Sequence, residues 1–247
     1  MHVENLVFVT GASRGLGAAL AQCYARPNTL LVTMSRAALP WAAQTHPSFD
    51  HLHVQADLST PEGARIAVEQ IQGLLSTQAQ RYVLINNAGT VAPVAACKNL
   101  DDSTALTTAY QLNLLSPISL CSAFLQHAPH KAQRQILNIS SGAGRRPVAG
   151  WAVYGSTKAA LDYYTQVLQQ ENPDLQAVSL APGVIDTDMQ AHIRSQDQDN
   201  FPDLNRFIDL HKNQQLSSAE LTAQRIVAYL DSPNFGRVTI DDIRHYE

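Results

Sequence analysis

The stretch LVFVTGASRGLGAALAQCYA, residues 6–25, joins a short apolar run to a glycine-rich turn and a helical pattern. The run "LVFVT" is typical of a strand buried on both faces. Glycines Gly11, Gly15 and Gly17 permit positive φ in the turn and let a pyrophosphate approach the backbone, and the next helix offers its free N–H groups to the anion. The spacing is G-x-x-x-G-x-G rather than the commoner G-x-G-x-x-G. We therefore expect a strand–turn–helix unit that binds a dinucleotide.

The same alternation continues along the chain. Further apolar runs occupy 30–34, 51–55, 82–86, 135–140 and 177–181, and helical patterns occupy 18–25, 64–75, 103–125 and 152–170. Alternating strands and helices predict an α/β fold, a doubly wound parallel sheet covered on both faces. No linker or composition shift interrupts the series, so we expect one domain over residues 1–247.

Residues 192–215 depart from this alternation, because they are polar and show no strand pattern. Such an insertion favours either a lid over a binding site, covering about 187–215, or a pair of surface helices without a function.

Composition excludes several classes of protein. The net charge is −4 without a run of like charges, which argues against a nucleic-acid or membrane-binding surface. Cys23, Cys97 and Cys121 form no C-x-x-C pair, and no segment reaches 18 apolar residues, so we expect a cytoplasmic protein without a membrane span. The nine histidines form no H-x-x-x-H group, and we expect no metal site.

The end of the second strand indicates which dinucleotide is bound. An NAD site commonly places a carboxylate there, whereas an arginine accommodates the 2′-phosphate of NADP. This strand ends with Ser35 and Arg36, and no carboxylate lies between Arg36 and Asp50. Arg14, inside the glycine turn, supplies a second cation. The sequence therefore predicts NADP(H).

Candidate catalytic residues follow the fifth apolar run. Tyr154 and Lys158 stand one helical turn apart, so the ammonium group can lie near the phenol and lower its pKa. Ser141 directly follows the run "ILNIS" and could hold a substrate carbonyl, with Ser140, one residue earlier, as the rival. Asn113 lies in a helical segment, where an amide is unfavourable unless it makes a specific bond.

Together these motifs resemble those of the short-chain dehydrogenase/reductase family. The matching segments, in order, are "TGASRGLG", "NNAG" (86–89), Asn113, Ser141, "YGSTK" and "APGVIDT" (181–187). The resemblance implies a Rossmann-type sheet with strand order 3-2-1-4-5-6-7, a nicotinamide dinucleotide and no catalytic metal. It also implies a homodimer or homotetramer formed through residues 103–125 and 152–170.

The resemblance assigns a role to each matching residue. Tyr154 would be the general acid, Lys158 would lower its pKa and bind the nicotinamide ribose, Ser141 would orient the carbonyl, and Asn113 would hold a water that links Lys158 to solvent. The implied cofactor contacts are Gly11, Ser13, Arg14, Gly15, Leu16, Gly17, Ser35, Arg36, Asp57, Leu58, Asn86, Ala88, Gly89, Tyr154, Lys158, Pro182, Gly183, Val184 and Thr187.

Within the family the chain is most similar to sepiapterin reductases and their microbial relatives that reduce benzil. This implies an NADPH-dependent carbonyl reductase acting on a ketone or diketone. Trp151 could form a flat wall for a planar substrate or simply pack, Met189 could touch substrate or fill the core, and Asp241 or Asp242 could anchor the substrate.

Two alternatives remain open from the sequence. One is a 3-oxoacyl thioester reductase of fatty-acid synthesis, although that branch usually ends in a glycine-rich segment and this chain ends in "IDDIRHYE". The other is a non-catalytic NADP-binding sensor, although such proteins typically lose the tyrosine or the lysine.

Overall fold

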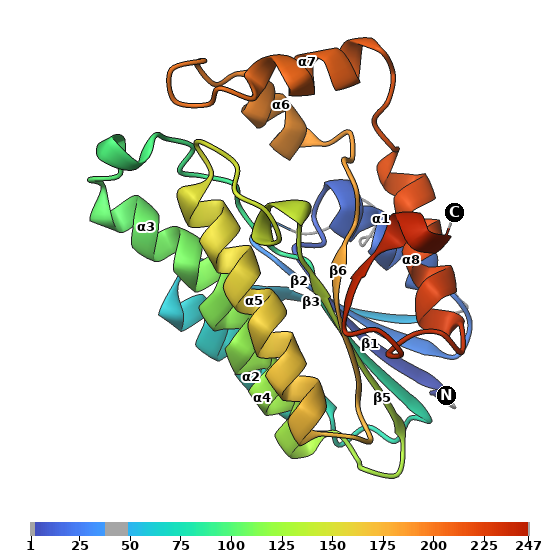
Figure 1. The fold of residues 1–247 in the computed structure, drawn as a ribbon. Coiled ribbons are helices and arrows are strands. Elements are labelled where there is room, and N and C mark those ends of the chain that lie inside the picture. Colours follow the sequence, from blue (N-terminus) through green and yellow to red (C-terminus); the bar gives the residue numbers. More distant parts are fainter. Residues whose placement is uncertain (1–2, 38–48, 247) are drawn as a thin grey trace.

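A seven-stranded parallel sheet forms the centre of the protein (Figure 1). The computed structural model describes residues 3–37 and 49–246. The strand order is β3-β2-β1-β4-β5-β6-β7, which confirms the predicted fold class and order. The strands are β1 Asn5–Thr10, β2 Thr29–Ser35, β3 Asp50–Gln55, β4 Arg81–Asn86, β5 Gln133–Ile139, β6 Gln176–Ala181 and β7 Ile240–Asp242.

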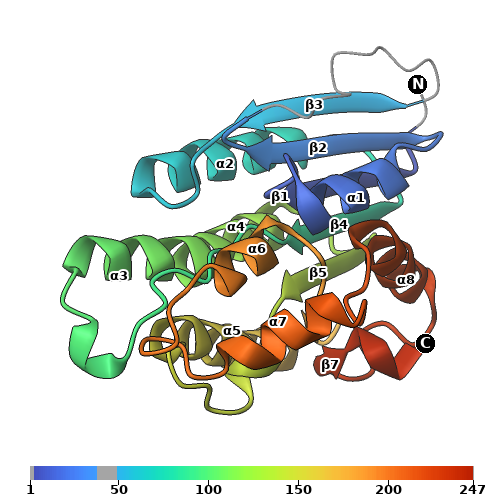
Figure 2. The same ribbon diagram turned by 90° about the horizontal axis from the view of Figure 1, so that it is seen from above.

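Helices cover both faces of the sheet. Helices α1 and α8 lie on one face, and α2, α4 and α5 lie on the other (Figures 1 and 2). The helices are α1 Gly15–Tyr24, α2 Pro61–Leu74, α3 Ser103–Tyr110, α4 Ser116–His127, α5 Ala152–Glu171, α6 Asp188–Arg194, α7 Leu204–Lys212 and α8 Ala219–Asp231. Shorter turns are η1 Cys97–Asn99, η3 Gly142–Gly144 and η4 Ile243–Tyr246.

Side chains of β1 alternate between two cores, which explains why the whole strand is apolar. Val7 and Val9 pack in the core under α1 and α8, whereas Leu6 and Phe8 pack in the core under α2 and α4. All four side chains are fully buried. A strand buried on both faces cannot show the polar alternation of a half-exposed one.

The predicted helix 103–125 is interrupted in the structure. A π-helical turn, η2 Gln111–Leu115, separates α3 from α4. The extra residue that a π turn accommodates widens the helix locally, and such turns occur frequently at functional sites. Asn113 lies at the middle of this turn, where its side chain bonds to the backbone of Thr90.

Residues 188–212, which contain α6 and α7, are called the flap below. They project above the end of the sheet in Figure 1, and Figure 2 shows them lying over the middle of the molecule. Within the described ranges, no helix is both long and apolar enough to cross a bilayer.

Candidate active site

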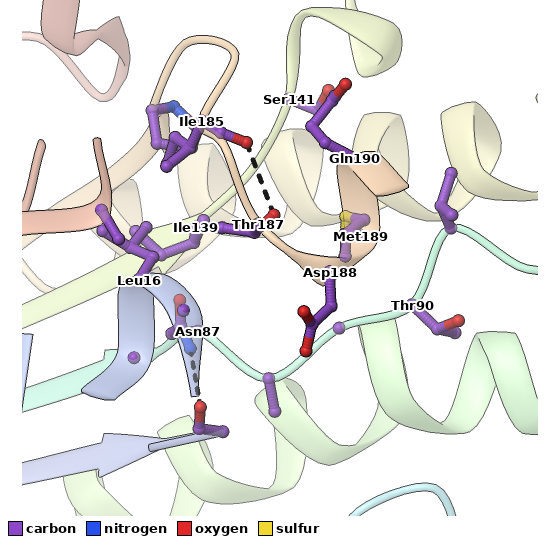
Figure 3. A pocket seen from close by; sticks show the side chains of 18 of the residues that line it. Leu16, Asn87, Thr90, Ile139, Ser141, Ile185, Thr187, Asp188, Met189 and Gln190 are labelled. Atoms are coloured by element: carbon purple, nitrogen blue, oxygen red, sulfur yellow. Dashed lines mark hydrogen bonds between the residues drawn. The ribbon is translucent and has the colours of Figure 1, made fainter. Parts of the chain in front are cut away.

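One cavity of about 1300 Å³ lies where the carboxyl ends of the strands meet the flap. Its lining comes from the glycine turn after β1, the segments after β2, β4, β5 and β6, the start of α5, and the flap. Figure 3 shows residues from several of these segments, among them Leu16, Ser141, Thr187 and Gln190, around the same space. Sites in doubly wound sheets occur at this edge, where the strand order changes direction.

The glycine turn forms one end of the cavity. Gly11 and Gly15 have φ of 66° and 54°, the left-handed region that favours glycine. A Cβ on Gly17 would lie 2.2 Å from the Gly11 carbonyl oxygen, so the turn closes only without a side chain there. The N-cap of α1, Arg14, makes no side-chain capping bond, in contrast to Thr60 of α2, which accepts from the Gly63 N–H. The first N–H groups of α1 are therefore available to an anion, and the turn fits a pyrophosphate.

The two predicted phosphate-binding arginines line the cavity on either side of this turn. Arg36 follows β2, near enough to Asp57 to help lower the pKa of that carboxyl, which is lowered mainly by the Ser59 hydroxyl. Arg14 pairs with Asp188 of the flap at 2.9 Å, and both side chains are mostly exposed. The other predicted residues at this end, Ser13, Leu16, Ser35, Leu58, Ala88 and Gly89, also line the cavity.

Asn86 requires a correction, because its side chain does not line the cavity. Its amide donates to Asn138 Oδ1 at 2.8 Å and to Cys121 Sγ at 3.3 Å, inside the sheet. The next residue, Asn87, points the other way, lines the cavity and donates to the Thr10 carbonyl at 3.0 Å. Successive residues of a strand face opposite sides, so a shift of one position moves the side chain from the site into the core.

The three residues expected to act on substrate come together. Tyr154 and Lys158, on α5, and Ser141, after β5, line the same part of the cavity. Lys158 Nζ donates to the Ile139 carbonyl at 2.7 Å and lies 5.8 Å from the centre of the Tyr154 ring. A hydrogen bond also joins Ser141 to Tyr154. The rival residue, Ser140, lines the cavity as well, but its hydroxyl is buried and has no partner within the described chain.

The electrostatics of this group differ from the sequence prediction. Burial raises the pKa of Tyr154, and only the Ser141 hydrogen bond opposes it. The sequence predicted that Lys158 lowers this pKa, whereas burial of the phenol is the larger influence and raises it. Burial also lowers the pKa of Lys158 to about 8, while the Asp162 carboxylate acts in the opposite direction.

The small residues near Tyr154 and Lys158 let η3 pack directly on α5. A Cβ on Gly155 would lie 2.9 Å from the Ala143 carbonyl oxygen, and one on Gly144 would lie 2.8 Å from the backbone of Lys158. Since η3 follows Ser141, this contact sets how close the serine comes to the tyrosine. The small side chains are thus required by the approach of two backbones.

Asn113 lies behind the cavity wall rather than in it. Its Oδ1 accepts from the Thr90 N–H at 2.8 Å, and its Nδ2 donates to the Thr90 carbonyl at 2.8 Å and to Thr157 Oγ1 at 3.1 Å. A Cβ on Gly89 would lie 3.3 Å from Asn113 Oδ1 and 3.7 Å from Lys158 Nζ. The amide therefore fixes the loop after β4 against α5, close to the lysine.

Aromatic side chains form the opposite end of the cavity. Trp151 meets the Tyr154 ring edge-on with centroids 5.5 Å apart, and it stacks on Phe201 at 4.9 Å. Phe207 of α7 packs against Trp151 at 5.3 Å and lines the cavity with it. Trp151 is thus both a packed residue and part of the wall. Met189 packs against the same cluster and also lines the cavity.

The two C-terminal aspartates lie in different surroundings. Asp241 is buried and accepts from the hydroxyls of Tyr229 and Tyr246 at 2.7 and 2.6 Å, away from the cavity, so the anchoring role considered for it is corrected. Asp242 lines the cavity and pairs with Arg244 at 2.5 Å.

The nicotinamide end predicted after β6 also lines the cavity, through Pro182, Gly183, Val184 and Thr187. Thr187 approaches the glycine turn, since its methyl would lie 3.2 Å from a Cβ on Gly15.

Sequence reasoning missed Asn87, Gln190, Phe201 and Phe207. The two phenylalanines carry a signal, because they are the only aromatic residues of the largely polar segment 192–215 apart from its histidines.

Comparisons with known proteins agree with this geometry. A family model described as short chain dehydrogenase matches residues 5–198. A benzil reductase ((S)-benzoin forming) from Bacillus cereus is 34% identical, covering 93% of this chain and 95% of the relative. A sepiapterin reductase from Xenopus tropicalis is 32% identical over 92% of this chain and 91% of the relative. The crystal structure of the KRED1-Pglu enzyme superposes with a TM-score of 0.81 at 34% identity, covering 94% of this chain and 98% of that one.

Proposed function

The chain belongs to the short-chain dehydrogenase family, and we propose that it is an NADPH-dependent carbonyl reductase that converts an aromatic ketone or diketone into the alcohol. The carrying observation is that Ser141, Tyr154 and Lys158 line one cavity with the glycine turn. The relatives named for benzil and sepiapterin reduction support this class of substrate.

Tyr154 is suited to deliver a proton. Reduction of a carbonyl leaves a developing negative charge on oxygen, and a general acid beside it must begin the step protonated. Burial raises the pKa of Tyr154, so its hydroxyl keeps the proton at neutral pH. Ser141 is placed to donate a hydrogen bond to the same oxygen, which stabilises the charge as it forms. Bound NADPH would supply the hydride.

Lys158 is placed to stabilise Tyr154 after the tyrosine has lost its proton. Its ammonium is held by the Ile139 carbonyl, close to the Tyr154 ring. When Tyr154 has given up its proton, the positive charge of Lys158 favours the phenolate that remains. The lysine thereby stabilises the deprotonated state that appears only during turnover.

The residues at the glycine turn fit a phosphorylated dinucleotide. The uncapped start of α1 faces the cavity, and a Cβ would fill the backbone cradle at Gly17. Arg14 and Arg36 would hold the 2′-phosphate, and no carboxylate ends β2 to favour NAD. A higher kcat/KM with NADPH than with NADH is expected, and the opposite preference would contradict this part of the proposal.

Two further features belong to the proposal. The flap would act as a lid, because its residues close one side of the cavity. Subunits would pair through the α3–α5 side, where Tyr110, Leu115 and Tyr163 are 37%, 47% and 70% exposed.

Replacing Tyr154 with Phe tests the function. The substitution removes the proton donor and keeps the ring, so NADPH oxidation with benzil should fall by about 10²- to 10⁴-fold. NADPH affinity, measured by fluorescence titration, should stay within about twofold of the wild-type value. The substitution removes one hydroxyl group and leaves the other residues that would contact the cofactor in place. Tyr163→Phe is the matched control, because this tyrosine lies on the same helix outside the cavity and the substitution keeps the ring that it would contribute to the subunit contact. Full turnover by Tyr154→Phe would refute the role.

A further inference from the structure

The start of the flap lies against the glycine turn. Arg14 Nη1 donates to Oδ2 of Asp188, the first residue of α6, at 2.9 Å. The preceding residue, Thr187, reaches the same turn, since its methyl carbon would lie 3.2 Å from a Cβ on Gly15. Arg14 and Asp188 both line the cavity, and in Figure 3 the Asp188 side chain extends from the start of α6 into the drawn space. A flap carboxylate therefore lies at the end of the cavity that fits the nucleotide.

The two arginines at this end of the cavity have different neighbours. Arg36 lies near Asp57, whose Oδ1 already accepts from the hydroxyl of Ser59 at 2.7 Å. Arg14 is paired with a carboxylate that belongs to the flap. Of the two arginines expected to hold the 2′-phosphate, Arg14 is therefore the one that a flap residue already binds.

The ion pair between Arg14 and Asp188 is of a kind that a phosphate can replace. The two side chains are 67% and 72% exposed, and one hydrogen bond joins them. Exposed pairs of this kind add little stability, because water and salt screen them. A phosphate carries more charge and can accept two parallel hydrogen bonds from a guanidinium, so it is the stronger partner.

The carboxylate also has a reason to leave when a phosphate arrives. Two anions that bind one guanidinium lie only a few ångströms apart, and like charges at that separation repel each other even in water. Asp188 is free of this repulsion once it turns toward solvent, because its side chain is already mostly exposed.

We propose that Asp188 is a specificity-determining residue for the cofactor, because it occupies the Arg14 guanidinium until the 2′-phosphate of NADPH replaces it. This rests on the proposed binding of that phosphate by Arg14 and Arg36. NADH carries a hydroxyl group in place of the 2′-phosphate and would leave the ion pair intact. Asp188 thus lowers the affinity for NADPH and makes release of the flap from the glycine turn depend on the 2′-phosphate.

Release of Asp188 would be felt at the other end of the cavity. Met189 follows it directly and packs against the cluster that contains Trp151 and Tyr154. The rest of the flap stays attached through the stack of Phe201 on Trp151. A change of partner at the glycine turn is therefore expected to loosen the start of α6, beside the proposed proton donor.

Two nucleotides without a nicotinamide isolate the 2′-phosphate. 2′,5′-ADP and 5′-AMP differ only in that group, and isothermal titration calorimetry gives the Kd of each. Wild type should bind 2′,5′-ADP more tightly than 5′-AMP. In Asp188→Asn, which keeps the shape of the side chain, the ratio of the 5′-AMP Kd to the 2′,5′-ADP Kd should rise about two- to fivefold, the scale of one exposed ion pair.

A double-mutant cycle assigns this rise to the ion pair. In an Arg14→Gln background, Asp188→Asn should leave the ratio unchanged, because no guanidinium remains to be released. Asp186→Asn is the matched control, since Asp186 also lines the cavity but pairs with Arg194 at 3.8 Å, and it should keep the wild-type ratio. A ratio that is unchanged or lower in Asp188→Asn, or that rises equally in the Arg14→Gln background, would overturn the proposal.

Hydrogen exchange of the α6 amides reports the release itself. In wild type, 2′,5′-ADP should speed the exchange of the amides in Asp188–Arg194, and 5′-AMP should not. In Asp188→Asn the exchange should already be fast, and neither nucleotide should change it. Equal or slower exchange of α6 in wild type with 2′,5′-ADP bound would contradict the release of Asp188.

The wild-type titrations distinguish this inference from the proposed function. If wild type prefers 2′,5′-ADP but Asp188→Asn does not raise the ratio, the role of Asp188 is wrong and the proposed use of NADPH stands. If wild type binds the two nucleotides equally, the proposed preference for NADPH is wrong and the inference falls with it.

Discussion

Lys158 is subject to opposing influences that set its charge. Burial lowers its pKa to about 8, and Asp162, one turn further along α5, raises it. Asp162 is itself fixed, because its Oδ1 accepts from Ser179 Oγ at 2.6 Å and its Oδ2 from Arg145 at 3.2 Å. Arg145 also donates to the Asp241 carbonyl at 2.8 Å, so the carboxylate is tied to β6 and to β7. Asp162 is a positioning residue for the lysine.

The activity should therefore depend on pH through Lys158. Below about pH 8 the amine is charged, and above it the charge is lost, so kcat/KM should decline through this range. Asp162→Asn removes the group that raises the pKa of Lys158, and the decline should move to lower pH. The measurement is kcat/KM for NADPH-dependent reduction of benzil between pH 6 and 10, roughly the range that spans His and Lys titration. Asp174→Asn, at an exposed position, should leave the profile in place; a profile unmoved by Asp162→Asn would contradict this linkage.

Single residues differ in how far their positions follow from sequence. Ser141, Tyr154 and Lys158 could be predicted to share a site. Ser141 follows a strand, Tyr154 and Lys158 stand one helical turn apart, and all three match the motifs of one family. Asn86 was assigned to the cofactor through the family resemblance alone, which does not show that its side chain turns into the core while that of Asn87 lines the cavity. Gln190 could not be found, since the sequence does not reveal which polar residue of α6 will be buried and line the cavity.

At the scale of elements, α5 and η3 act as one unit. The contact between Gly155 and the Ala143 carbonyl, and that between Gly144 and the Lys158 backbone, leave no room for a methyl group. The helix that carries the tyrosine and the turn that follows the serine are therefore already at the closest approach that their backbones permit. Spacing within one helix was predictable, whereas contact between two backbones depends on the folded arrangement.

Adding one methyl group to this contact should disturb both stability and catalysis. Gly155→Ala places a Cβ 2.9 Å from the Ala143 carbonyl oxygen, so α5 or η3 must shift. We expect the free energy of unfolding in urea to fall by about 1–3 kcal/mol, with a lower kcat. Gly73→Ala is the control, because nothing lies within 4 Å of its Cβ, and alanine there should be neutral or stabilise α2 by about 1 kcal/mol. Equal stability of the two variants would contradict the packing argument.

The interruption at Gln111–Leu115 shows what a helical pattern omits. Apolar residues recur with helical spacing throughout 103–125, and that spacing predicted one helix. The side chain of Asn113 bonds to both backbone groups of Thr90, and the π turn brings it there. A pattern of apolar residues does not report a polar side chain that bonds across to a loop, so the break lay outside what periodicity can predict.

At the scale of the molecule, the flap is attached to the sheet-bearing part at identifiable points. Asn200 Oδ1 accepts from the Ala96 N–H at 3.2 Å and from Asn99 Nδ2 at 3.0 Å. Gly150 passes directly beneath, with φ of 85° and only 2.4 Å between its ideal Cβ position and the Asn200 carbonyl oxygen. The loops after β4 and before α5 thus hold the flap over the cavity.

Removing this attachment should affect substrate more than cofactor. Asn200→Ala deletes the acceptor of two hydrogen bonds between the flap and the loop after β4, and KM for the ketone should rise about 3- to 10-fold. KM for NADPH should change little, because the glycine turn lies between β1 and α1, outside the flap. Steady-state kinetics with each substrate varied in turn measure both constants, with Asn234→Ala in an exposed loop as control. A rise confined to KM for NADPH would show that the flap serves the nucleotide instead.

The overall fold was the most predictable level. Regular alternation of strands and helices predicted the parallel sheet, and the family motifs implied its order, which the structure confirms. The flap was recognised only as a departure from that alternation. It packs on Trp151 through Phe201, which lies between α6 and α7, and through Phe207 of α7. These contacts join residues distant in sequence, and no local pattern encodes them.

The stack of Trp151 on Phe201 joins the flap to the residue that precedes α5, so the flap and the helix of the proposed proton donor are separate segments that meet at this tryptophan. Substitutions in the flap, residues 188–212, would alter the shape and polarity of the side of the cavity that the flap forms. The proposed proton donor, Tyr154, would keep its place on α5. A library of variants restricted to the flap should therefore change which ketones are reduced. Every variant would keep the same Ser141, Tyr154 and Lys158.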